Sequence, residues 1–502
     1  KTAAASGKMS AKSYYYDPAY QTQETLKDES GEKIGTLTYT NKAYFNSNLS
    51  SYDNMTFESE DGNNIDTDSI LFFDFDYNAT TGTTNSAIGS SSSLNIKDMY
   101  KKKAAAELKK AGADEKDVDY SDKLNKQVSD DWKADVKAGN KIYAKLSYHN
   151  NRQSGEVKLA FTLSDSYKKS EDYKQYAIYK YKTGDDNADV ITNDNYLYSG
   201  LVTVDNAYSI GSYTYQWYKA DASGEYKKLD YTSDSINLKN SNVIDPESKT
   251  DDKLKCIATV KYNGIEIQSI EYDYTVYKVS SESLYTMDDD YSDYSWAYAK
   301  KDGKAVLNSG YEAINGATAK YTWQKYDEKE KTYKTVDGQS GKTLTIDKCT
   351  DADYVSYRAQ IQIYVGECLY TSFEKTIQLV ENPPYSVNNK TGYGKNAEKD
   401  DADGKYYSQY SLSNNVVPGD TDNMTVDVKA DTGYSLTYTW YEYKDKKWEE
   451  ITDAKTNVYS KKFETADFDS TTSKQYKCKV TATNGTLTYD KSSFTFIENR
   501  DP

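Results

Sequence analysis

The stretch that decides the fold reads LTYTWYEYKDKKWEEITDAK over residues 436–455 and, after a polar segment, QYKCKVTATNGTLTYDKSSFTF over residues 475–496. Apolar and polar side chains alternate around Trp440 and again around Cys478. Alternation with a period of two predicts a β-strand with one buried face. Asn484-Gly485 follows the second strand and is a strong hairpin signal, so this strand is expected to fold back on another.

The same pattern occurs twice upstream. It appears as YTYQWYK around Trp217 with LKCIATVKYNG around Cys256, and as AKYTWQKYD around Trp323 with YRAQIQIYVG around Ala359. In all three copies the second strand follows the tryptophan by 36 to 39 residues, and the tryptophans are 106 and 117 residues apart. A repeat of about a hundred residues built from short strands predicts an array of β-sandwiches.

These motifs resemble those of tandem bacterial immunoglobulin-like modules, with the tryptophan in strand C and the cysteine position in strand F. A second aromatic residue, eight to ten positions after each tryptophan, also fits: Tyr226, Tyr333 and Trp448. The resemblance implies three modules, at 196–280, 281–381 and 385–499. No cysteine occupies the strand-B position that disulfide-bonded members of the fold use, so the strand-F cysteine is expected to be a lone buried thiol.

The first two fifths of the chain lack this repeat. The apolar run at 70–77 is expected to be a central strand of a first sandwich. Residues 96–111 are rich in good helix formers after a capping Asn95, and residues 121–138 carry an apolar stripe every fourth residue, so both are predicted helices. We therefore expect a mostly β protein: an N-terminal β-sandwich domain at 1–185 with a helical insertion at about 96–138, followed by tandem immunoglobulin-like β-sandwiches.

Composition excludes some classes of partner. The chain has 63 Lys and Arg against 79 Asp and Glu, a net charge of −16, which argues against a nucleic-acid partner because phosphate binding needs a basic face. No run approaches roughly eighteen consecutive apolar residues, so no membrane insertion is expected. Tyrosine is unusually frequent, with 53 residues, and exposed tyrosines make adhesive surfaces for sugars or proteins.

The sequence names no catalytic residue, and we expect no enzyme. A Ser-His or Cys-His nucleophile needs an imidazole, and the single histidine, His149, lies in a polar hairpin that is read as solvated. Four cysteines spread over three modules cannot converge on zinc, and no phosphate-binding glycine loop is present. A carboxylate pair of the glycosidase type stays open, but acidic residues are too abundant for any pair to be singled out.

Calcium is the one cation that the acidic loops suggest, since it takes several oxygen ligands from loops. The weak candidates are Asp61, Asp66 and Asp68, within the run 60–68. Two further acidic runs lie at 288–293 and 400–404. None has the spacing of an EF-hand, and solvated loops are the favoured reading of all three. No cofactor is otherwise expected.

An aromatic and acidic cluster outside the repeat is the candidate ligand site. It contains Asp293, Tyr294, Trp296 and Tyr298, and rings set among carboxylates can stack on a sugar and accept its hydroxyl hydrogens. The alternative is a packing patch between modules. Trp132 on the second predicted helix is a further candidate, although its apolar stripe is also explained by packing.

Two functions follow from these features. The first is a non-catalytic, secreted or bacterial cell-surface binding protein whose exposed Tyr and Trp bind a polysaccharide or other extracellular ligand. Its composition also resembles that of starch- or glycan-adhering surface proteins of anaerobic bacteria. The second is a structural stalk, adhesin or filament subunit that self-associates through the N-terminal segment, residues 1–20, by strand addition to a neighbouring sheet edge.

Overall fold

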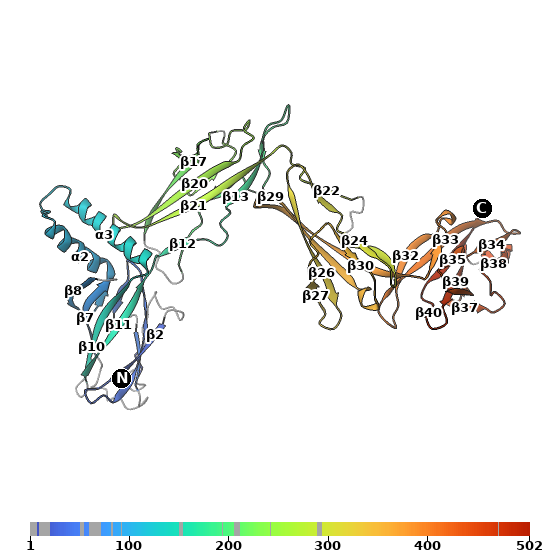
Figure 1. Ribbon diagram of the computed structural model, residues 1–502, viewed down its shortest axis with the longest axis horizontal. Helices are drawn as coiled ribbons and strands as arrows, with labels where there is room; N and C mark the ends of the chain where they lie inside the picture. Colours follow the sequence, from blue (N-terminus) through green and yellow to red (C-terminus); the bar gives the residue numbers. More distant parts are fainter. Residues whose placement is uncertain are drawn as a thin grey trace. The chain divides into compact units, whose positions relative to one another are not determined.

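The computed structural model describes residues 8–9, 21–50, 55–59, 72–81, 84–91, 93–149, 154–192, 194–204, 211–240, 242–288, 294–469 and 471–501. The chain forms two compact units, Lys1–Ser280 (unit 1) and Ser281–Pro502 (unit 2), coloured blue to green and yellow to red in Figure 1. The finer division into four domains stays a prediction. Each unit consists mainly of β-sheet.

Two sheets form the first part of unit 1, with the orders β1-β6-β3-β2 and β4-β11-β10-β7-β8. Their strands are β1 (Lys8–Met9), β2 (Gln21–Lys27), β3 (Lys33–Thr40), β4 (Lys42–Ala43), β6 (Met55–Ser59), β7 (Phe72–Thr81), β8 (Thr84–Ser91), β10 (Lys141–His149) and β11 (Ser154–Leu163). A ribbon of β5 (Asn48–Ser50) and β9 (Ser93–Asn95) leads into the helices. The predicted central strand corresponds to β7, which has a neighbour on each side.

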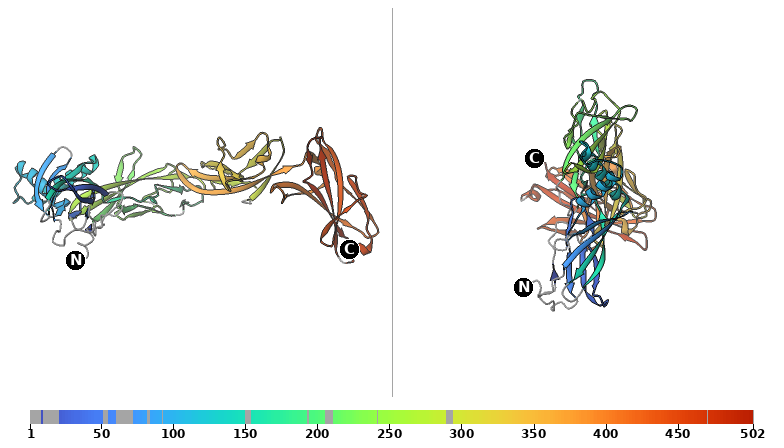
Figure 2. Two further views of the ribbon diagram at one scale, coloured as in Figure 1. Left: turned by 90° about the horizontal axis from the view of Figure 1, so that it is seen from below. Right: turned by 90° about the vertical axis from the view of Figure 1, so that its left-hand side faces the viewer.

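The two predicted helices are present as α2 (Ile96–Lys110) and α3 (Tyr120–Ala138), side by side in Figures 1 and 2. The Asn95 side chain accepts a hydrogen bond from the Asp98 amide at 3.0 Å, and Gly139 ends α3 in the left-handed conformation at φ 68°. Val128 and Trp132 on the apolar stripe of α3 are buried. The apolar stripe predicted on this helix therefore packs into the core of unit 1.

Each immunoglobulin-like module contains the same five-stranded sheet. The orders are β13-β21-β20-β17-β18, β23-β30-β29-β26-β27 and β33-β41-β39-β36-β37. In every module the first two strands of this order are parallel: β13 with β21, β23 with β30, and β33 with β41. The other neighbours are antiparallel.

The bounds of these strands are as follows. The first sheet contains β13 (Tyr176–Lys180), β17 (Ser212–Ala220), β18 (Tyr226–Lys228), β20 (Asp252–Tyr262) and β21 (Ile265–Val279). The second contains β23 (Tyr294–Lys300), β26 (Thr318–Asp327), β27 (Thr332–Thr335), β29 (Ser356–Val365) and β30 (Cys368–Asn382). The third contains β33 (Tyr406–Val416), β36 (Ser435–Lys444), β37 (Lys447–Ile451), β39 (Ser473–Thr483) and β41 (Ser493–Arg500).

Further short strands complete the modules, mostly as two-stranded ribbons. In the first module these are β12 (Tyr167–Lys169) with β16 (Leu201–Thr203), β15 (Tyr196–Tyr198) with β19 (Ser235–Asn237), and β14 (Asp189–Val190) beside β13. In the second they are β22 (Tyr285–Met287) with β25 (Tyr311–Ala313), and β24 (Ala305–Asn308) with β28 (Thr343–Ile346). In the third they are β31 (Tyr385–Val387) with β35 (Val428–Ala430), β34 (Thr421–Thr425) with β38 (Val458–Lys462), and β32 (Gly394–Lys399) and β40 (Thr488–Tyr489) at the main sheet.

The three repeated tryptophans form the centres of the modules, as the sequence predicted. Trp217, Trp323 and Trp440 are each 0 % exposed. Each lies directly opposite the strand-F position in the ladder, which is Cys256, Ala359 or Cys478 respectively. Each indole N–H donates to a backbone carbonyl of the same module at 2.8–2.9 Å. A buried indole with a satisfied N–H explains why the motif recurs.

The second aromatic residue of the motif also has a constant partner. The basic residue just before the strand-F position lies over its ring: Lys255 over Tyr226 at 4.9 Å, Arg358 over Tyr333 at 4.0 Å, and Lys477 over Trp448 at 4.2 Å. The basic member faces away from the core, because it alternates with buried residues in its strand. The aromatic member is exposed or half-buried in a strand that has no buried residue. This outer cation–π pair is therefore part of the repeat.

The structure corrects one part of the sequence analysis. Strand β13 falls within the range assigned to the N-terminal domain, but it pairs with β21 of the first immunoglobulin-like module, with Tyr176 opposite Thr275. A single hydrophobic core runs through this part of unit 1, from Leu26 to Val276. The partner of a parallel edge strand lies about a hundred residues away, and local alternation carries no information about it.

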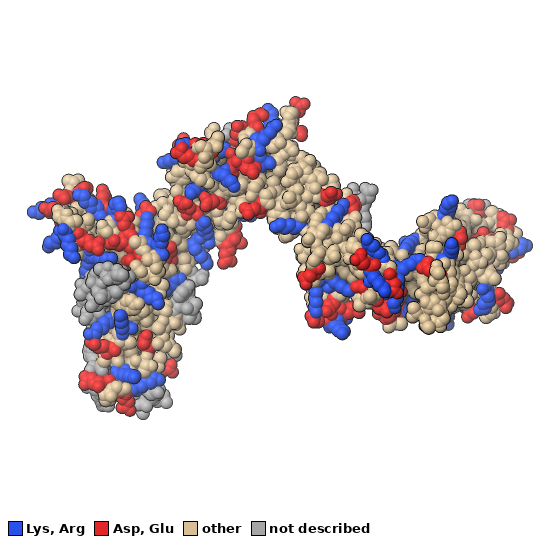
Figure 3. All heavy atoms as spheres, viewed as in Figure 1, with Lys and Arg blue, Asp and Glu red and all other residues tan. Residues whose placement is uncertain are grey.

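Acidic and basic side chains are intermingled on the face shown in Figure 3. All four cysteines are buried free thiols. Within the described part of the chain, neither helix has the length and apolar character needed to cross a membrane.

Candidate functional site

Several predicted site residues fall outside the described residues. These are Asp293 of the aromatic cluster and the weak calcium candidates Asp61, Asp66 and Asp68. Trp132 is 1 % exposed, and its ring packs edge-on against Phe45 and Tyr100, with centroids 5.2 and 5.4 Å away. This position leaves the indole no face for a ligand, so Trp132 is a core residue and not part of a binding site.

The remaining aromatic candidates lie on β23, next to the third module. Trp296 is half-buried, and its ring contacts Tyr294 at 5.3 Å and Tyr406 on β33 at 5.0 Å. Tyr298 lies under the ammonium group of Lys395 at 3.7 Å. The structure thus brings Tyr294, Trp296 and Tyr298 together with residues of the third module, which favours the packing alternative; a ligand role stays a prediction.

Lys395 on β32 reaches back to the second module. Its Nζ donates to Asn382 Oδ1 at 2.9 Å, and Ser408 Oγ donates to the same oxygen at 2.6 Å. Burial of the ammonium group lowers the pKa of Lys395 to about 8. Lys395 is an exposed residue of β32, and its Nζ lies 3.7 Å from the ring centre of Tyr298 and 5.9 Å from that of Tyr410.

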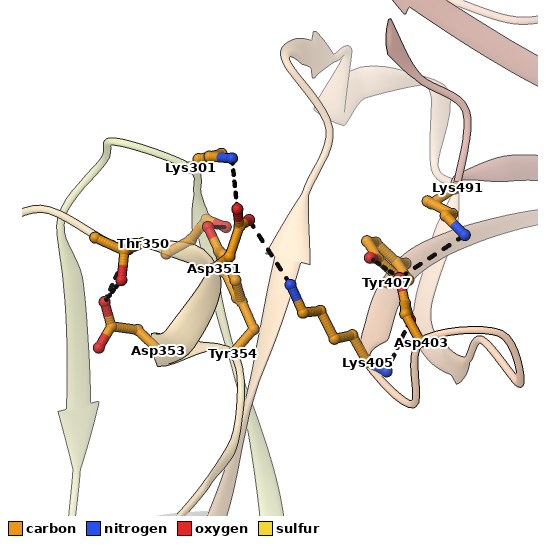
Figure 4. Close-up of polar contacts among 10 residues, drawn as sticks. Lys301, Thr350, Asp351, Asp353, Tyr354, Asp403, Lys405, Tyr407 and Lys491 are labelled. Atoms are coloured by element: carbon orange, nitrogen blue, oxygen red, sulfur yellow. Dashed lines mark hydrogen bonds and ion pairs between the residues drawn. The ribbon is translucent and has the colours of Figure 1, made fainter. Parts of the chain in front are cut away.

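Polar contacts continue across the junction of the second and third modules (Figure 4). Asp351 accepts a hydrogen bond from Lys301 at 2.8 Å, and Lys405 Nζ lies 3.7 Å from its other carboxylate oxygen. On the third module, Tyr407 donates to Asp403 at 2.7 Å, and Lys491 Nζ lies 3.8 Å from the same carboxylate. These contacts reach from the junction to a hollow on the third module.

That hollow lies on the outer face of the main sheet of the third module and has a volume of about 390 Å³. We call it the groove. Strand β32 and the following turn form one wall, the β37 hairpin contributes a second, and β39 lies between them. Its lining includes Glu398, Lys399, Asp400, Tyr407, Gln409, Tyr441, Trp448, Lys477, Lys479, Asp490 and Lys491.

The fold explains why these side chains face outward. Tyr441 follows the buried Trp440 in β36, and Lys477 and Lys479 flank the buried Cys478 in β39. Strand alternation therefore points all three away from the core. The Trp448 ring contacts Lys477 at 4.2 Å and Tyr443 at 5.0 Å, which holds it in one orientation.

The groove combines aromatic rings with ion pairs and amides. Lys491 donates to Asp400 at 2.6 Å, and Lys479 Nζ lies 3.2 Å from Asp490. Gln409 is oriented by Lys491 and Ser493, donating to the carbonyl of the first and accepting from the amide and hydroxyl of the second at 2.8–2.9 Å. A ligand here would meet the half-buried rings of Tyr441 and Trp448 and several groups that donate or accept hydrogen bonds, whereas Tyr407 is only 5 % exposed.

Two carboxylates of the groove, Asp400 and Asp490, are paired with lysines. The hydrogen bond from Lys491, together with a backbone amide, holds the pKa of Asp400 below its usual value. Asp490 pairs with Lys479. A general acid near neutral pH needs a raised pKa, and Asp400 has the opposite shift.

Two carboxylates of the acidic loop at 400–404 lie around the ammonium group of Lys491. Asp400 and Asp403 both engage Lys491, and Asp403 also accepts from Tyr407. Among the described residues, no group of three or more His, Cys, Asp or Glu side chains is arranged to hold a metal ion.

The groove was not predicted from the sequence. Trp448 was identified there only as the second aromatic residue of the repeat, and Tyr407, Tyr441 and Lys477 were not identified as site residues. Alternation around Trp440 and Cys478 would have placed Tyr441, Lys477 and Lys479 on one outer face. A second signal for the groove was available in the spacing of the tryptophans. The last two are 117 residues apart and the first two are 106 apart, and the longer spacing accommodates β32 and its turn.

Neither protein-family models nor curated proteins give a match. Among solved structures, the N-terminal four Ig domains of Dscam1 isoform 9.44 match at 11 % identity and a TM-score of 0.18, over 96 % of this chain and 99 % of that one. Three N-terminal domains of the bacteriophage RB49 outer capsid protein Hoc match at 12 % identity and a TM-score of 0.17, over 65 % of this chain and 98 % of that one.

Proposed function

We propose that this chain is a non-enzymatic, secreted or bacterial cell-surface binding protein, and that its groove binds a polysaccharide. The observation that carries the proposal is the groove on the third module, where Tyr407, Tyr441 and Trp448 lie among lysines, carboxylates and an oriented amide. The other immunoglobulin-like modules act as scaffold.

The composition of the groove favours a polyhydroxylated ligand over an apolar one. An apolar ligand would cover ion pairs and the Gln409 amide without replacing the water that solvates them, which costs free energy. Sugar hydroxyl groups can donate to the carboxylates and accept from the lysines, and the faces of sugar rings pack on aromatic side chains. The site is open on a sheet face, which suits a long chain.

The same geometry supports binding without catalysis. Two of the three groove carboxylates, Asp400 and Asp490, are paired with lysines. The single histidine, His149, is not among the residues that line the groove.

Affinity electrophoresis in gels that contain starch, xylan or mucin tests the proposal. The full chain should be retarded in at least one gel, and the Tyr441→Ala/Trp448→Ala variant should migrate at its rate in a gel without polysaccharide. Tyr226→Ala is the matched control, because it removes the equivalent outer ring of the first module. Unchanged migration of the full chain in all three gels would remove the polysaccharide claim.

A second candidate function is a structural stalk or adhesin, which the junction in unit 2 favours. Glu381 at the end of β30 pairs with Tyr407 of β33, so the main sheets of the two modules are joined. Lys300 also donates to both carboxylate oxygens of Asp431 at 2.7 Å. Such links stiffen a tandem array.

Self-association through residues 1–20 is the accompanying proposal. Light scattering of the full chain and of a chain that lacks residues 1–20 distinguishes a strand-exchanged polymer from a chain that does not self-associate through this segment. A strand-exchanged polymer must lose its mass on truncation, whereas equal masses would exclude self-association through residues 1–20.

A further inference from the structure

The outer basic residue of the repeat has a carboxylate partner in the first two modules. In the first module, Lys255 forms an ion pair with Glu271 on β21, at 2.8 Å. In the second module, Arg358 Nε lies 3.1 Å from Glu374 on β30. A glutamate on the following strand therefore neutralises the outer cation in both modules.

The third module lacks this glutamate. Glu271 and Glu374 each precede by two positions the residue that lies opposite the cation in the ladder. The same position in β41 is Ser493, because Lys477 lies opposite Thr495. Among the described residues, Lys477 forms no ion pair, and the contact of its ammonium group is with an aromatic ring. Of the three copies of the outer cation, the one that lines the groove is thus the unpaired one.

The charges of the groove are also unbalanced. Four lysines and three carboxylates are among its lining residues. Two of the lysines pair with Asp400 and Asp490, which leaves Lys399 and Lys477 with Glu398 as the remaining carboxylate. This local excess of positive charge is opposite to the net charge of the chain, which is −16.

The surroundings of Lys477 favour an anionic group on the ligand. Lys477 is half-buried in β39, and burial lowers the pKa of its ammonium group, an effect that Glu398 offsets in part. An ammonium group that has lost part of its water gains more from a nearby negative charge than a fully solvated one does. The half-buried rings of Trp448 and Tyr441 provide apolar surface in the same groove.

We propose that the groove binds an acidic polysaccharide, whose carboxylate or sulfate group pairs with Lys477 while a sugar ring packs on the side chain of Trp448 or Tyr441. This inference rests on the proposed function and narrows its class of ligand. Both kinds of acidic group present charged oxygen atoms that accept hydrogen bonds from an ammonium group. A nucleic acid would need a basic face, which a groove with three carboxylates does not offer.

Affinity electrophoresis of the full chain in paired gels tests the proposal. One pair contains polygalacturonate and its methyl-esterified form, in which the same sugar chain has lost its charge. The other pair contains dextran sulfate and unmodified dextran, so that the two pairs distinguish a carboxylate from a sulfate. Retardation should be several-fold greater in the acidic member of at least one pair, and it should decrease as sodium chloride is added, because salt screens the new ion pair.

The outcomes separate this inference from the proposed function. Equal retardation by both members of each pair, or greater retardation by the uncharged members, would overturn the acidic ligand and leave the polysaccharide-binding groove in place. Migration unchanged in these four gels, with retardation by starch or xylan, would have the same meaning. Migration unchanged in every gel, those with starch, xylan and mucin included, would remove both claims.

Two variants test the part played by Lys477. Lys477→Met keeps the side-chain stem without its charge, and Ser493→Glu supplies the carboxylate that the other two modules have at this position. Both variants should lose the additional retardation by the acidic polysaccharide. Lys255→Met is the matched control, because it removes the paired cation of the first module, and it should be retarded like the parent.

Full retardation of Lys477→Met and of Ser493→Glu by the acidic polysaccharide would overturn the assignment of its acidic group to Lys477. Thermal unfolding of each variant shows whether unit 2 is folded. The paired gels compare polysaccharides on the unaltered chain, so they decide the ligand class even if a variant folds poorly.

Discussion

At the scale of single residues, two tryptophans eight positions apart in the third module have opposite environments. Trp440 is fully buried against Tyr459 and Phe496, whereas Trp448 lies half-buried on the outer face beside Lys477. Trp440→Ala should lower the free energy of unfolding by about 3–5 kcal/mol, because it opens a cavity in the core. Trp448→Ala should lower it by about 1 kcal/mol, the usual contribution of an exposed cation–π pair.

Denaturant unfolding of unit 2 in the full chain measures both effects. A Trp440→Ala protein with the same midpoint as the parent would refute the assignment of this residue to the centre of a module.

Lys395 provides a test by pH. Its folded-state pKa is about 8 against 10.5 for the free side chain, so the folded state disfavours the charged form. This cost is fully present below pH 8 and is relieved as the pH rises toward 10.5, because the folded protein then releases its proton before the unfolded chain does. The Lys395→Met variant should therefore gain less stability than the parent between pH 7.5 and pH 9.5.

Denaturation midpoints at the two pH values provide the measurement. Identical pH dependence in the parent and in Lys395→Met would show that the ammonium group is solvated and that its contact with Tyr298 is incidental.

At the scale of secondary-structure elements, local pattern predicted more than long-range pairing. The strands around Trp440 and Cys478 and the helix capped by Asn95 were predicted because alternation, capping and helix propensity are read within a few residues. The parallel partner of β13 and the wall made by β32 could not be read in this way, since both depend on strands brought together by the fold. The groove depends on that wall, and for this reason it emerged only from the structure.

Strand β23 supplies the prediction at this scale. Trp296 contacts Tyr406 across the junction, so Trp296→Ala should lower the stability of unit 2 by about 1–2 kcal/mol and leave polysaccharide retardation in the gel unchanged. Thermal unfolding and affinity electrophoresis of the same sample provide both readings. Loss of retardation at full stability would instead assign Trp296 to the ligand site.

At the scale of the whole molecule, the chain consists of two compact units. Calorimetry should therefore resolve two unfolding transitions, since separate cores unfold separately. Trp217→Ala should lower only the transition of unit 1, and Trp440→Ala only that of unit 2. One cooperative transition shifted by both variants would contradict the division.

The central claim is that the groove of the third module, and not the aromatic residues of β23, binds the polysaccharide. Hydrogen–deuterium exchange of the full chain, with and without oligosaccharides of the polysaccharide that retards it, tests this most directly. The account predicts slower exchange in β32, β37 and β39, and unchanged exchange in unit 1 and in β23. Protection confined to β23, or to unit 1, would contradict it.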